Sequence, residues 1–214
     1  MKNLIVPALI ADSPDQLSNV ITRVAPYFDL LQLDIMDGRF VHNTSLDFEF
    51  DLPAGKRYEA HLMIEEPEKW IDKNWKKVHT ILAPIETCKD PWRVIEFLKD
   101  KRKVGFVLNP ETPVESIYEY LEAIDQVQIM TVHPGDYGSE FLPEALDKVR
   151  SLRKKRPDLD LEVDGGIGPK TIKQVQEAGT NMFVSGSYIV KSNDIQGAID
   201  TLENILRGEH DQDE

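Results

Sequence analysis

Residues 30–38, with the sequence LLQLDIMDG, carry the pattern that decides the fold. An apolar run that ends in an Asp-Gly pair is typical of a buried strand followed by a turn. Successive side chains of a strand point to opposite faces, so Gln32, Asp34 and Met36 share one face and the leucines and isoleucine between them share the other. If the apolar face packs under helices, the polar face is turned towards the lumen of a barrel.

Short apolar, β-branched runs of this kind recur along the whole chain. We predict strands at residues 3–10, 30–35, 58–64, 78–82, 104–108, 127–132, 159–163 and 182–185. Segments with helical spacing lie between them, at residues 14–27, 67–75, 91–100, 114–121, 143–156, 170–178 and 195–206. Strands that alternate with helices in this order predict an α/β fold, namely a single-domain (β/α)8 TIM barrel rather than an open doubly wound sheet.

The predicted barrel domain spans residues 1–207. Between Gly38 and Lys56 there is room for only about one turn of helix, so we expect the second helix of the barrel to be short or missing. Residues 208–214 are charged and offer nothing apolar to bury, which predicts a disordered tail without a function of its own.

Composition narrows the class of protein further. The chain of 214 residues has 25 Lys and Arg against 38 Asp and Glu, a net charge of -13. An acidic surface disfavours nucleic acids and anionic membranes as partners, because phosphate contacts need clustered Lys and Arg. The apolar N-terminal stretch is interrupted by Pro7 and is too short to span a bilayer. With Cys88 as the single cysteine, no internal disulfide can form, and we expect a cytoplasmic protein.

Polar side chains interrupt the ends of several predicted strands, which is where a barrel carries its chemistry. The alternation that places Asp34 in the lumen also places His61 there, and Asp164 ends the seventh strand. Two carboxylates, a histidine and several methionines are therefore expected to meet at one mouth of the barrel. Taken singly, each has a plainer interpretation: a histidine satisfied by backbone groups, an aspartate that caps a helix or turn, and methionines that fill the lumen.

In joint order and spacing these residues resemble the ribulose-phosphate 3-epimerase family, and the resemblance runs nearly end to end. Its landmarks are Pro7 with residues 9–12, residues 33–38 followed by Phe40, Val41 and Asn43, and then residues 61–64, 108–110, 112–113, 130–132, 134–135, 162–166 and 186–187. The resemblance implies a metal-assisted isomerase of the pentose phosphate pathway that interconverts D-ribulose 5-phosphate and D-xylulose 5-phosphate through an enediolate.

The resemblance also implies roles for particular residues. Asp34 and Asp164 would be the catalytic acid and base, and both would bind one divalent metal ion together with His61. The ion itself is not specified: Zn, Fe, Mn, Co and Mg all remain candidates. The expected substrate-binding residues are Met36, Met63, Met130, Gly135, Gly138, Gly165, Gly166, Gly186 and Ser187. The methionines would cap the planar intermediate, and the Gly pairs suit a phosphate held by backbone N–H groups.

The chain departs from the family pattern at several of these positions. Gln32, the fourth expected metal ligand, stands where the family has a second metal-binding histidine. Its amide oxygen suits Mg²⁺ or Mn²⁺ better than Zn²⁺. Ala8 stands where the family has a serine. His133 is a candidate for the missing nitrogen donor, because it follows a strand end near the same mouth. Asp136 and Tyr137 replace the usual Phe-Gly of the loop over the substrate.

These departures leave other functions open. An epimerase or isomerase for another ketose phosphate, such as a hexulose 6-phosphate, would keep the same residues with an altered loop, and so would a sugar-phosphate-binding barrel that has lost efficient catalysis. A related lyase is disfavoured, because it would carry Lys where Met36 stands. In each case the expected partner is a phosphorylated ketose, and a homo-oligomer is compatible with the sequence.

Overall fold

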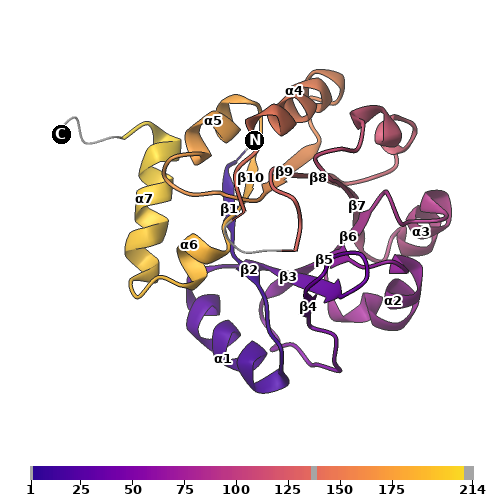
Figure 1. Cartoon of the computed structure of the whole chain (residues 1–214), viewed down its shortest axis with the longest axis horizontal. Helices are drawn as coiled ribbons and strands as arrows, with labels where there is room; N and C mark the ends of the chain where they lie inside the picture. Colours follow the sequence, from indigo (N-terminus) through magenta and orange to yellow (C-terminus); the bar gives the residue numbers. More distant parts are fainter. Residues whose placement is uncertain (1, 136–138, 210–214) are drawn as a thin grey trace.

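The computed structural model describes residues 2–135 and 139–209, which form one barrel of parallel strands with helices around it (Figure 1). The strands are β1 (Leu4–Val6), β2 (Ala8–Leu9), β3 (Leu30–Asp37), β4 (Thr44–Ser45), β5 (Arg57–Met63), β6 (Thr80–Pro84), β7 (Lys103–Leu108), β8 (Gln126–Met130), β9 (Asp160–Asp164) and β10 (Met182–Val184). The helices are α1 (Pro14–Val24), α2 (Pro67–Asn74), α3 (Pro91–Leu98), α4 (Leu146–Lys155), α5 (Ile172–Glu177), α6 (Ser187–Val190) and α7 (Ile195–Arg207). Four short 3-10 helices complete the fold: η1 (Ala25–Tyr27), η2 (Trp75–Lys77), η3 (Val114–Tyr120) and η4 (Pro143–Ala145).

The barrel closes through the first strand, which is split at Pro7. Neighbouring strands follow the order β1-β10-β9-β8-β7-β6-β5-β3-β2, and β1 and β2 are consecutive in the chain. The N–H of Ser185 donates to the Val6 carbonyl at 2.8 Å, and the N–H of Gln32 donates to the Pro7 carbonyl at 3.0 Å. The two halves of one short stretch therefore hold the two ends of the sheet together.

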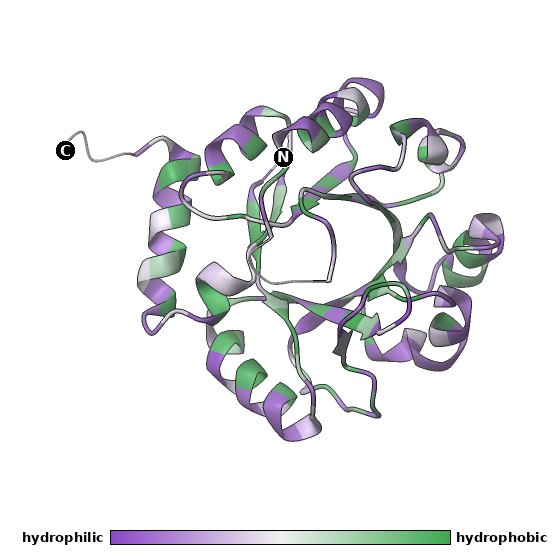
Figure 2. Cartoon of the chain, viewed as in Figure 1, coloured by the Kyte–Doolittle hydropathy of each residue, from purple (hydrophilic) through white to green (hydrophobic). Residues whose placement is uncertain are grey.

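Local sequence signals explain where the outer helices begin. Ser13, Asp90 and Asp194 precede α1, α3 and α7, and the side chain of each accepts a hydrogen bond from a backbone N–H of the first turn. Figure 2 shows the helices apolar towards the barrel and polar towards solvent. In α7, for example, six apolar residues are buried, and the helix ends at Gly208, whose φ of 75° is left-handed.

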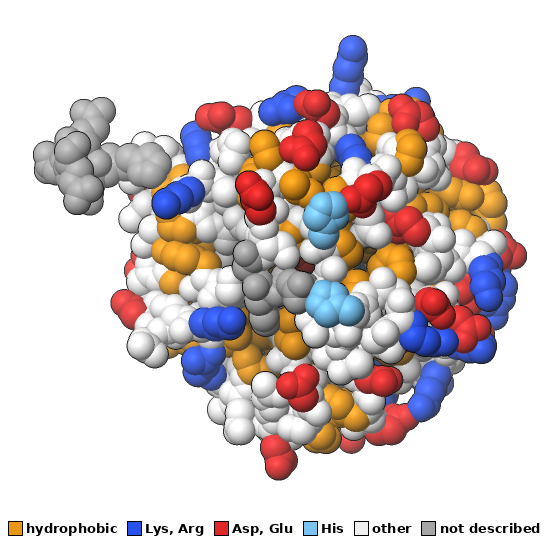
Figure 3. Space-filling model, in the orientation of Figure 1, with side chains coloured by type: hydrophobic (Ala, Val, Ile, Leu, Met, Phe, Trp, Pro, Cys, Tyr) orange, Lys and Arg blue, Asp and Glu red, His pale blue; other side chains and the backbone are white. Residues whose placement is uncertain are grey.

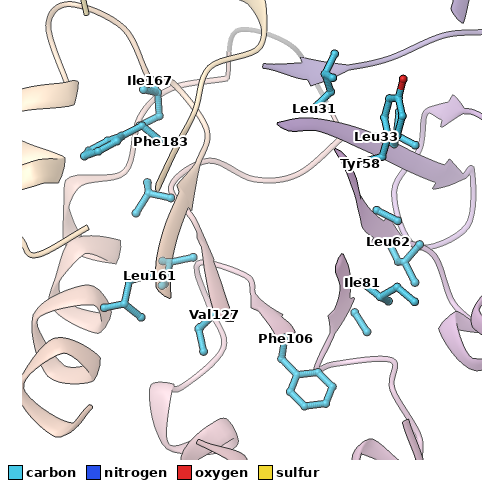
Figure 4. Close-up of a cluster of buried hydrophobic side chains, with 14 of the residues drawn as sticks. Leu31, Leu33, Tyr58, Leu62, Ile81, Phe106, Val127, Leu161, Ile167 and Phe183 are labelled. Carbon is cyan, nitrogen blue, oxygen red and sulfur yellow. The ribbon is translucent and has the colours of Figure 1, made fainter. Parts of the chain in front are cut away.

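The apolar core is a ring between the sheet and the helices. Figure 4 shows part of it, with side chains that point out of the barrel, among them Leu33, Leu62, Phe106, Val127 and Leu161. Because strand side chains alternate, the neighbouring residues in each strand point into the lumen. The core therefore fixes which polar side chains meet inside the barrel.

The predicted TIM barrel and its missing second helix are confirmed. Residues 38–56, all of them described, contain no helix, and β4 instead pairs antiparallel with the end of β3. Within the described residues no helix is long and apolar enough to cross a membrane. Of the expected tail at 208–214, residues 210–214 lie outside the described residues.

Two helices differ from the sequence-based expectation. Residues 114–120 form a 3-10 helix rather than an α-helix, in a segment that holds two β-branched residues and two tyrosines and has no side-chain cap. The four-residue α6 was not expected, since one turn is too short to show a helical period.

Candidate active site

A pocket of about 270 Å³ opens at the end of the barrel where the strands finish. Among its lining residues are Asp34 from β3, Met63 from β5, Met130 from β8 and Asp164 from β9. The pocket therefore lies at the face of a TIM barrel where active sites are built.

Three titratable side chains meet at this pocket: Asp34 and Asp164 line it, and His61 contacts both. Their possible ligand atoms, from Asp34, His61 and Asp164, all lie within 4.8 Å of one another. His61 Nδ1 is 3.4 Å from Asp34 Oδ1 and 3.3 Å from Asp164 Oδ2, so the imidazole lies between the carboxylates. The pairing of β3 with β5 places Asp34 directly beside His61.

Two buried glutamines complete the cluster. Gln32 Nε2 donates to Asp34 Oδ1 and to Asp164 Oδ2, each at 2.8 Å. Gln128 Nε2 lies 3.1 Å from His61 Nδ1 and 3.2 Å from Asp164 Oδ2. Gln128 was missed in the sequence, although it precedes Met130 by two residues just as Gln32 precedes Asp34, and the same alternation places it in the lumen.

Burial and mutual contact set the charges in this cluster. Burial raises the pKa of Asp34, and the charge of Asp164 adds to this, while a hydrogen bond with His61 opposes it. For His61, burial lowers the pKa, but hydrogen bonds to Asp164 and Asp34 outweigh it and raise the pKa to about 9. This shift favours the protonated imidazole at neutral pH when no metal ion is bound to it.

A second set of polar side chains fills the lumen beneath the cluster. Glu59 and Glu162 are fully buried, and Gln126 Nε2 donates to Glu162 Oε2. Burial raises the pKa of Glu59 to about 7, and burial together with the charge of Glu59 raises the pKa of Glu162 well above its usual value. These raised pKa values favour a protonated carboxyl group. A proton on one of the two groups allows Glu59 and Glu162 to form a hydrogen bond with each other.

The methionines and glycines expected to bind substrate lie in the pocket wherever they are described. Its lining includes Met36, Met63, Met130, Gly135, Gly165, Gly166, Gly186 and Ser187. Among the lining residues, all of them described, there is no Lys or Arg, and the basic side chains on the face drawn in Figure 3 lie mostly towards its periphery. An anion in this pocket would therefore rely on uncharged donors, namely backbone N–H groups and side-chain hydroxyl groups. Gly138, expected to bind substrate, and Asp136 and Tyr137, expected in the loop over the substrate, lie outside the described residues.

The loop after β9 is held in a fixed shape beside the pocket. Thr131 Oγ1 donates to the carbonyls of Asp164 at 3.1 Å and Gly165 at 2.7 Å, and Ser185 Oγ donates to the Ile167 carbonyl at 2.9 Å. Gly165 has a φ of 118°, which other residues rarely adopt.

Gly165→Ala is expected to lower the free energy of unfolding by about 1–3 kcal/mol, through strain and overpacking. An added Cβ would lie 2.6 Å from Val132 Cγ2 and 2.9 Å from the Val132 backbone nitrogen. Chemical denaturation measures the change. Gly168→Ala is the matched control in the same loop, because its Cβ would meet nothing within 4 Å. Equal losses in the two variants would contradict this explanation.

His133 does not supply the missing nitrogen donor, so that expectation is wrong. Its side chain is 68% exposed, and its Nδ1 lies 2.9 Å from Glu111 Oε1. β8 ends at Met130, and the chain leaves the barrel wall before His133 is reached. Ala8 is buried at the pocket wall, where the family serine would stand.

A larger hollow of about 1550 Å³ lies at the opposite end of the barrel, where the strands begin. Lys2, Arg57, Lys103 and Asp160 are among its lining residues, and none of the three clustered side chains lines it. Size alone therefore does not mark the reactive end.

Together, the barrel and the buried carboxylate and imidazole cluster at its mouth define a TIM-barrel enzyme with a site suited to proton transfer and metal binding. Comparison with known proteins is more specific. Residues 4–190 match the model of the ribulose-phosphate 3 epimerase family. The chain belongs to the ribulose-phosphate 3-epimerase family.

Individual relatives agree with this assignment. The chain is 31% identical over 230 residues to a ribulose-phosphate 3-epimerase of Eremothecium gossypii, covering 98% of this chain and 95% of the relative. It is 38% identical over 190 residues to the cytoplasmic isoform of that enzyme from Oryza sativa subsp. japonica, covering 84% and 83%. Among solved structures, the KGPDC from Streptococcus mutans superposes with a TM-score of 0.68 at 14% identity, covering 99% of this chain and 100% of that one, which shows a shared fold.

Proposed function

We propose that this protein is a ribulose-phosphate 3-epimerase that interconverts D-ribulose 5-phosphate and D-xylulose 5-phosphate. The observation that carries the proposal is the convergence of Asp34 and Asp164, from opposite parts of the sequence, on one small pocket with His61 between them. Inversion at C3 requires a base on one face of the carbon and an acid on the other, and two carboxyl groups can provide both.

In this mechanism one aspartate accepts the proton from C3, and the other donates its proton to C3 from the opposite face. The intermediate is the enediolate, and the product is the sugar inverted at C3. After the reaction the proton lies on the other aspartate of the pair. The raised pKa of Asp34 is in the direction needed for a carboxyl group that holds a proton at the start of one reaction direction. The reverse direction uses the same two groups with their roles interchanged.

The site also fits a divalent metal ion. Two carboxylates and an imidazole lie within 4.8 Å of one another, and the buried Gln32 Oε1 has no hydrogen-bond partner among the described residues. Asp34, His61, Asp164 and Gln32 would hold the ion. When bound, the ion would supply Lewis-acid stabilisation of the negative charge that develops on the substrate oxygens. An oxygen-rich donor set favours Mn²⁺ or Mg²⁺ over Zn²⁺.

The rest of the pocket would position the substrate. Met36, Met63 and Met130 provide an apolar, polarisable wall for the planar intermediate and keep water from it. Backbone N–H groups at Gly165, Gly166, Gly186 and Ser187 would bind the phosphate, since the described lining has no cationic side chain.

Metal removal and replacement test the proposal. The purified protein is stripped with a chelator and assayed for epimerisation of D-ribulose 5-phosphate with Mg²⁺, Mn²⁺, Fe²⁺, Co²⁺ or Zn²⁺ in turn. We expect turnover to be lost on stripping and restored best by Mn²⁺ or Mg²⁺, with solvent deuterium incorporated at C3. Absence of turnover and of exchange with every ion would overturn the proposal. Exchange with a hexulose 6-phosphate alone would assign a different ketose.

A further inference from the structure

The lumen of the barrel contains an unusual concentration of unsatisfied hydrogen-bond acceptors. Among the described residues, six buried side-chain atoms lack a hydrogen-bond partner. Five of the six are acceptor oxygens in the lumen, namely Gln32 Oε1, Gln128 Oε1, Glu59 Oε1, Glu59 Oε2 and Glu162 Oε1. An unpaired buried acceptor is destabilising. A proton shared between Glu59 and Glu162 can pair carboxyl oxygens, but the two amide oxygens have no such partner and require an explanation.

The strand register places these acceptors next to one another. Gln32 on β3 is in register with Glu59 on β5, and Gln128 on β8 is in register with Glu162 on β9. All four side chains are 0% exposed. Side chains in register on adjacent strands are neighbours on the same face, so each amide has a carboxyl group beside it.

The amide nitrogens are directed to the other side, towards the candidate metal cluster. Gln32 Nε2 bridges Asp34 and Asp164, and Gln128 Nε2 contacts Asp164 and His61. In this orientation both amides donate to carboxylate oxygens that would bind a cation. Among the described residues, neither amide donates a hydrogen bond to Glu59 or Glu162. Glu162 instead accepts a hydrogen bond from Gln126.

Rotation of an amide group by half a turn exchanges its oxygen and nitrogen with almost no change of shape. The same rotation in Gln32 and in Gln128 would turn two carbonyl oxygens towards Asp34, His61 and Asp164. It would also turn the two NH₂ groups towards the side of Glu59 and Glu162, whose carboxyl oxygens can accept hydrogen bonds from them. Two carbonyl oxygens beside two carboxylates repel one another unless a cation lies among them.

We propose that Gln128 is a second amide ligand of the metal site, and that Gln32 and Gln128 bind a hard divalent cation as a pair through their carbonyl oxygens. This inference rests on the proposed function only in that the cation binds at Asp34, His61 and Asp164. The complete donor set is then two carboxylates, one imidazole and two amide oxygens. Mn²⁺ and Mg²⁺ prefer sets rich in oxygen donors, whereas Zn²⁺ is usually held by four ligands with nitrogen or sulfur prominent.

The test is direct metal binding, without a substrate. Metal-stripped protein is titrated with Mn²⁺ while electron paramagnetic resonance measures free Mn²⁺, and with Zn²⁺ by calorimetry. For Gln128→Leu we expect the Mn²⁺ dissociation constant to rise about 10–100-fold, with a much smaller change for Zn²⁺. For Gln32→His we expect the preference for Zn²⁺ over Mn²⁺ to increase at least about tenfold, because imidazole is the better donor for Zn²⁺.

Gln126→Leu is the matched control. Gln126 lies on the same strand and the same face as Gln128 and is 2% exposed, but it donates to Glu162 instead of the cluster. We expect Mn²⁺ binding by this variant to stay within about twofold of the unmodified protein, since the ligands are unchanged. Gln128→Met, which keeps the length of the side chain, replaces Gln128→Leu if circular dichroism shows that the leucine variant does not fold.

The possible failures are distinguishable. Unchanged Mn²⁺ affinity in both Gln128 variants would overturn the assignment of Gln128 and leave the proposed function intact. Equal losses in the Gln126 and Gln128 variants would also overturn it, since a general effect of the lumen would then explain the result. If the unmodified protein binds no divalent cation at all, the metal site of the proposed function fails, and the paired ligands fail with it.

Discussion

Asp34→Asn and Asp164→Asn are each expected to lower the kcat of epimerisation by about 10²–10⁴-fold, the range usual for loss of a general acid or base. Asparagine keeps the shape of the side chain but can neither accept nor deliver the proton at C3. The steady-state rate with D-ribulose 5-phosphate measures the loss. Because both side chains are also candidate metal ligands, the metal content of each variant is determined in parallel and restored by excess ion.

Solvent exchange separates the roles of the two aspartates. If each serves one face of C3, a variant that retains one aspartate still exchanges the proton of one epimer with deuterium from the solvent. The two variants are then expected to retain exchange in opposite epimers. Loss of exchange from both epimers in both variants, at full metal content, would count against two separate bases.

Glu59→Gln is expected to stabilise the protein at pH 8 by about 1–3 kcal/mol and to change little at pH 4.5. Burial raises the pKa of Glu59 from 4.5 to about 7 in the folded protein. The folded state therefore binds a proton that the unfolded state has released, and the stabilisation from this group is present below pH 4.5 and lost as the pH rises through about 7. Glutamine keeps the volume, carries no charge at any pH, and so removes this loss.

Guanidinium unfolding at several pH values, with chelator present, tests this prediction. The free energy of unfolding of the variant should exceed that of the unmodified protein increasingly between pH 4.5 and pH 7, and the difference should then level off. Glu115→Gln, on the exposed surface of η3, is the control for loss of one carboxyl group. A variant less stable at pH 8 than the unmodified protein would contradict the prediction, because it would show that the ionised Glu59 carboxylate stabilises the fold.

Much of the barrel and part of the site followed from strand alternation. The period of two in residues 30–38 placed Gln32 and Asp34 in the lumen, and the structure has them there. The same alternation also places Gln128 in the lumen, but a neutral amide that is neither an acid, a base nor part of the family pattern carries no signal of function in the sequence. His133 was misplaced because the sequence predicted a strand up to residue 132, whereas β8 ends at Met130, three residues before His133.

Other features depend on information that a single segment does not carry. Pro7 can be seen in the sequence, but only the pairing of β1 with β10 and of β2 with β3 shows that it divides one strand between two partners. Which way an amide points is likewise decided by groups from distant strands. The fold class can be predicted from the local hydrophobic period, whereas the electrostatics of the lumen depend on side chains from all the strands around the barrel.

The closure of the barrel at residues 4–9 also constrains how the chain can fold during synthesis. Leu4 pairs with Met182, a separation of 182 − 4 = 178 residues, although β2 needs only β3, which follows soon after it. β2 can thus be paired early, while the edge of β1 stays uncovered until residues 182–184 have been made. Contacts between such distant residues are slow to form, because a long loop has to be closed first. The last step of barrel assembly therefore joins residues 4–6 to residues 182–184, and until then β1 is an open edge for chaperones or for other nascent chains.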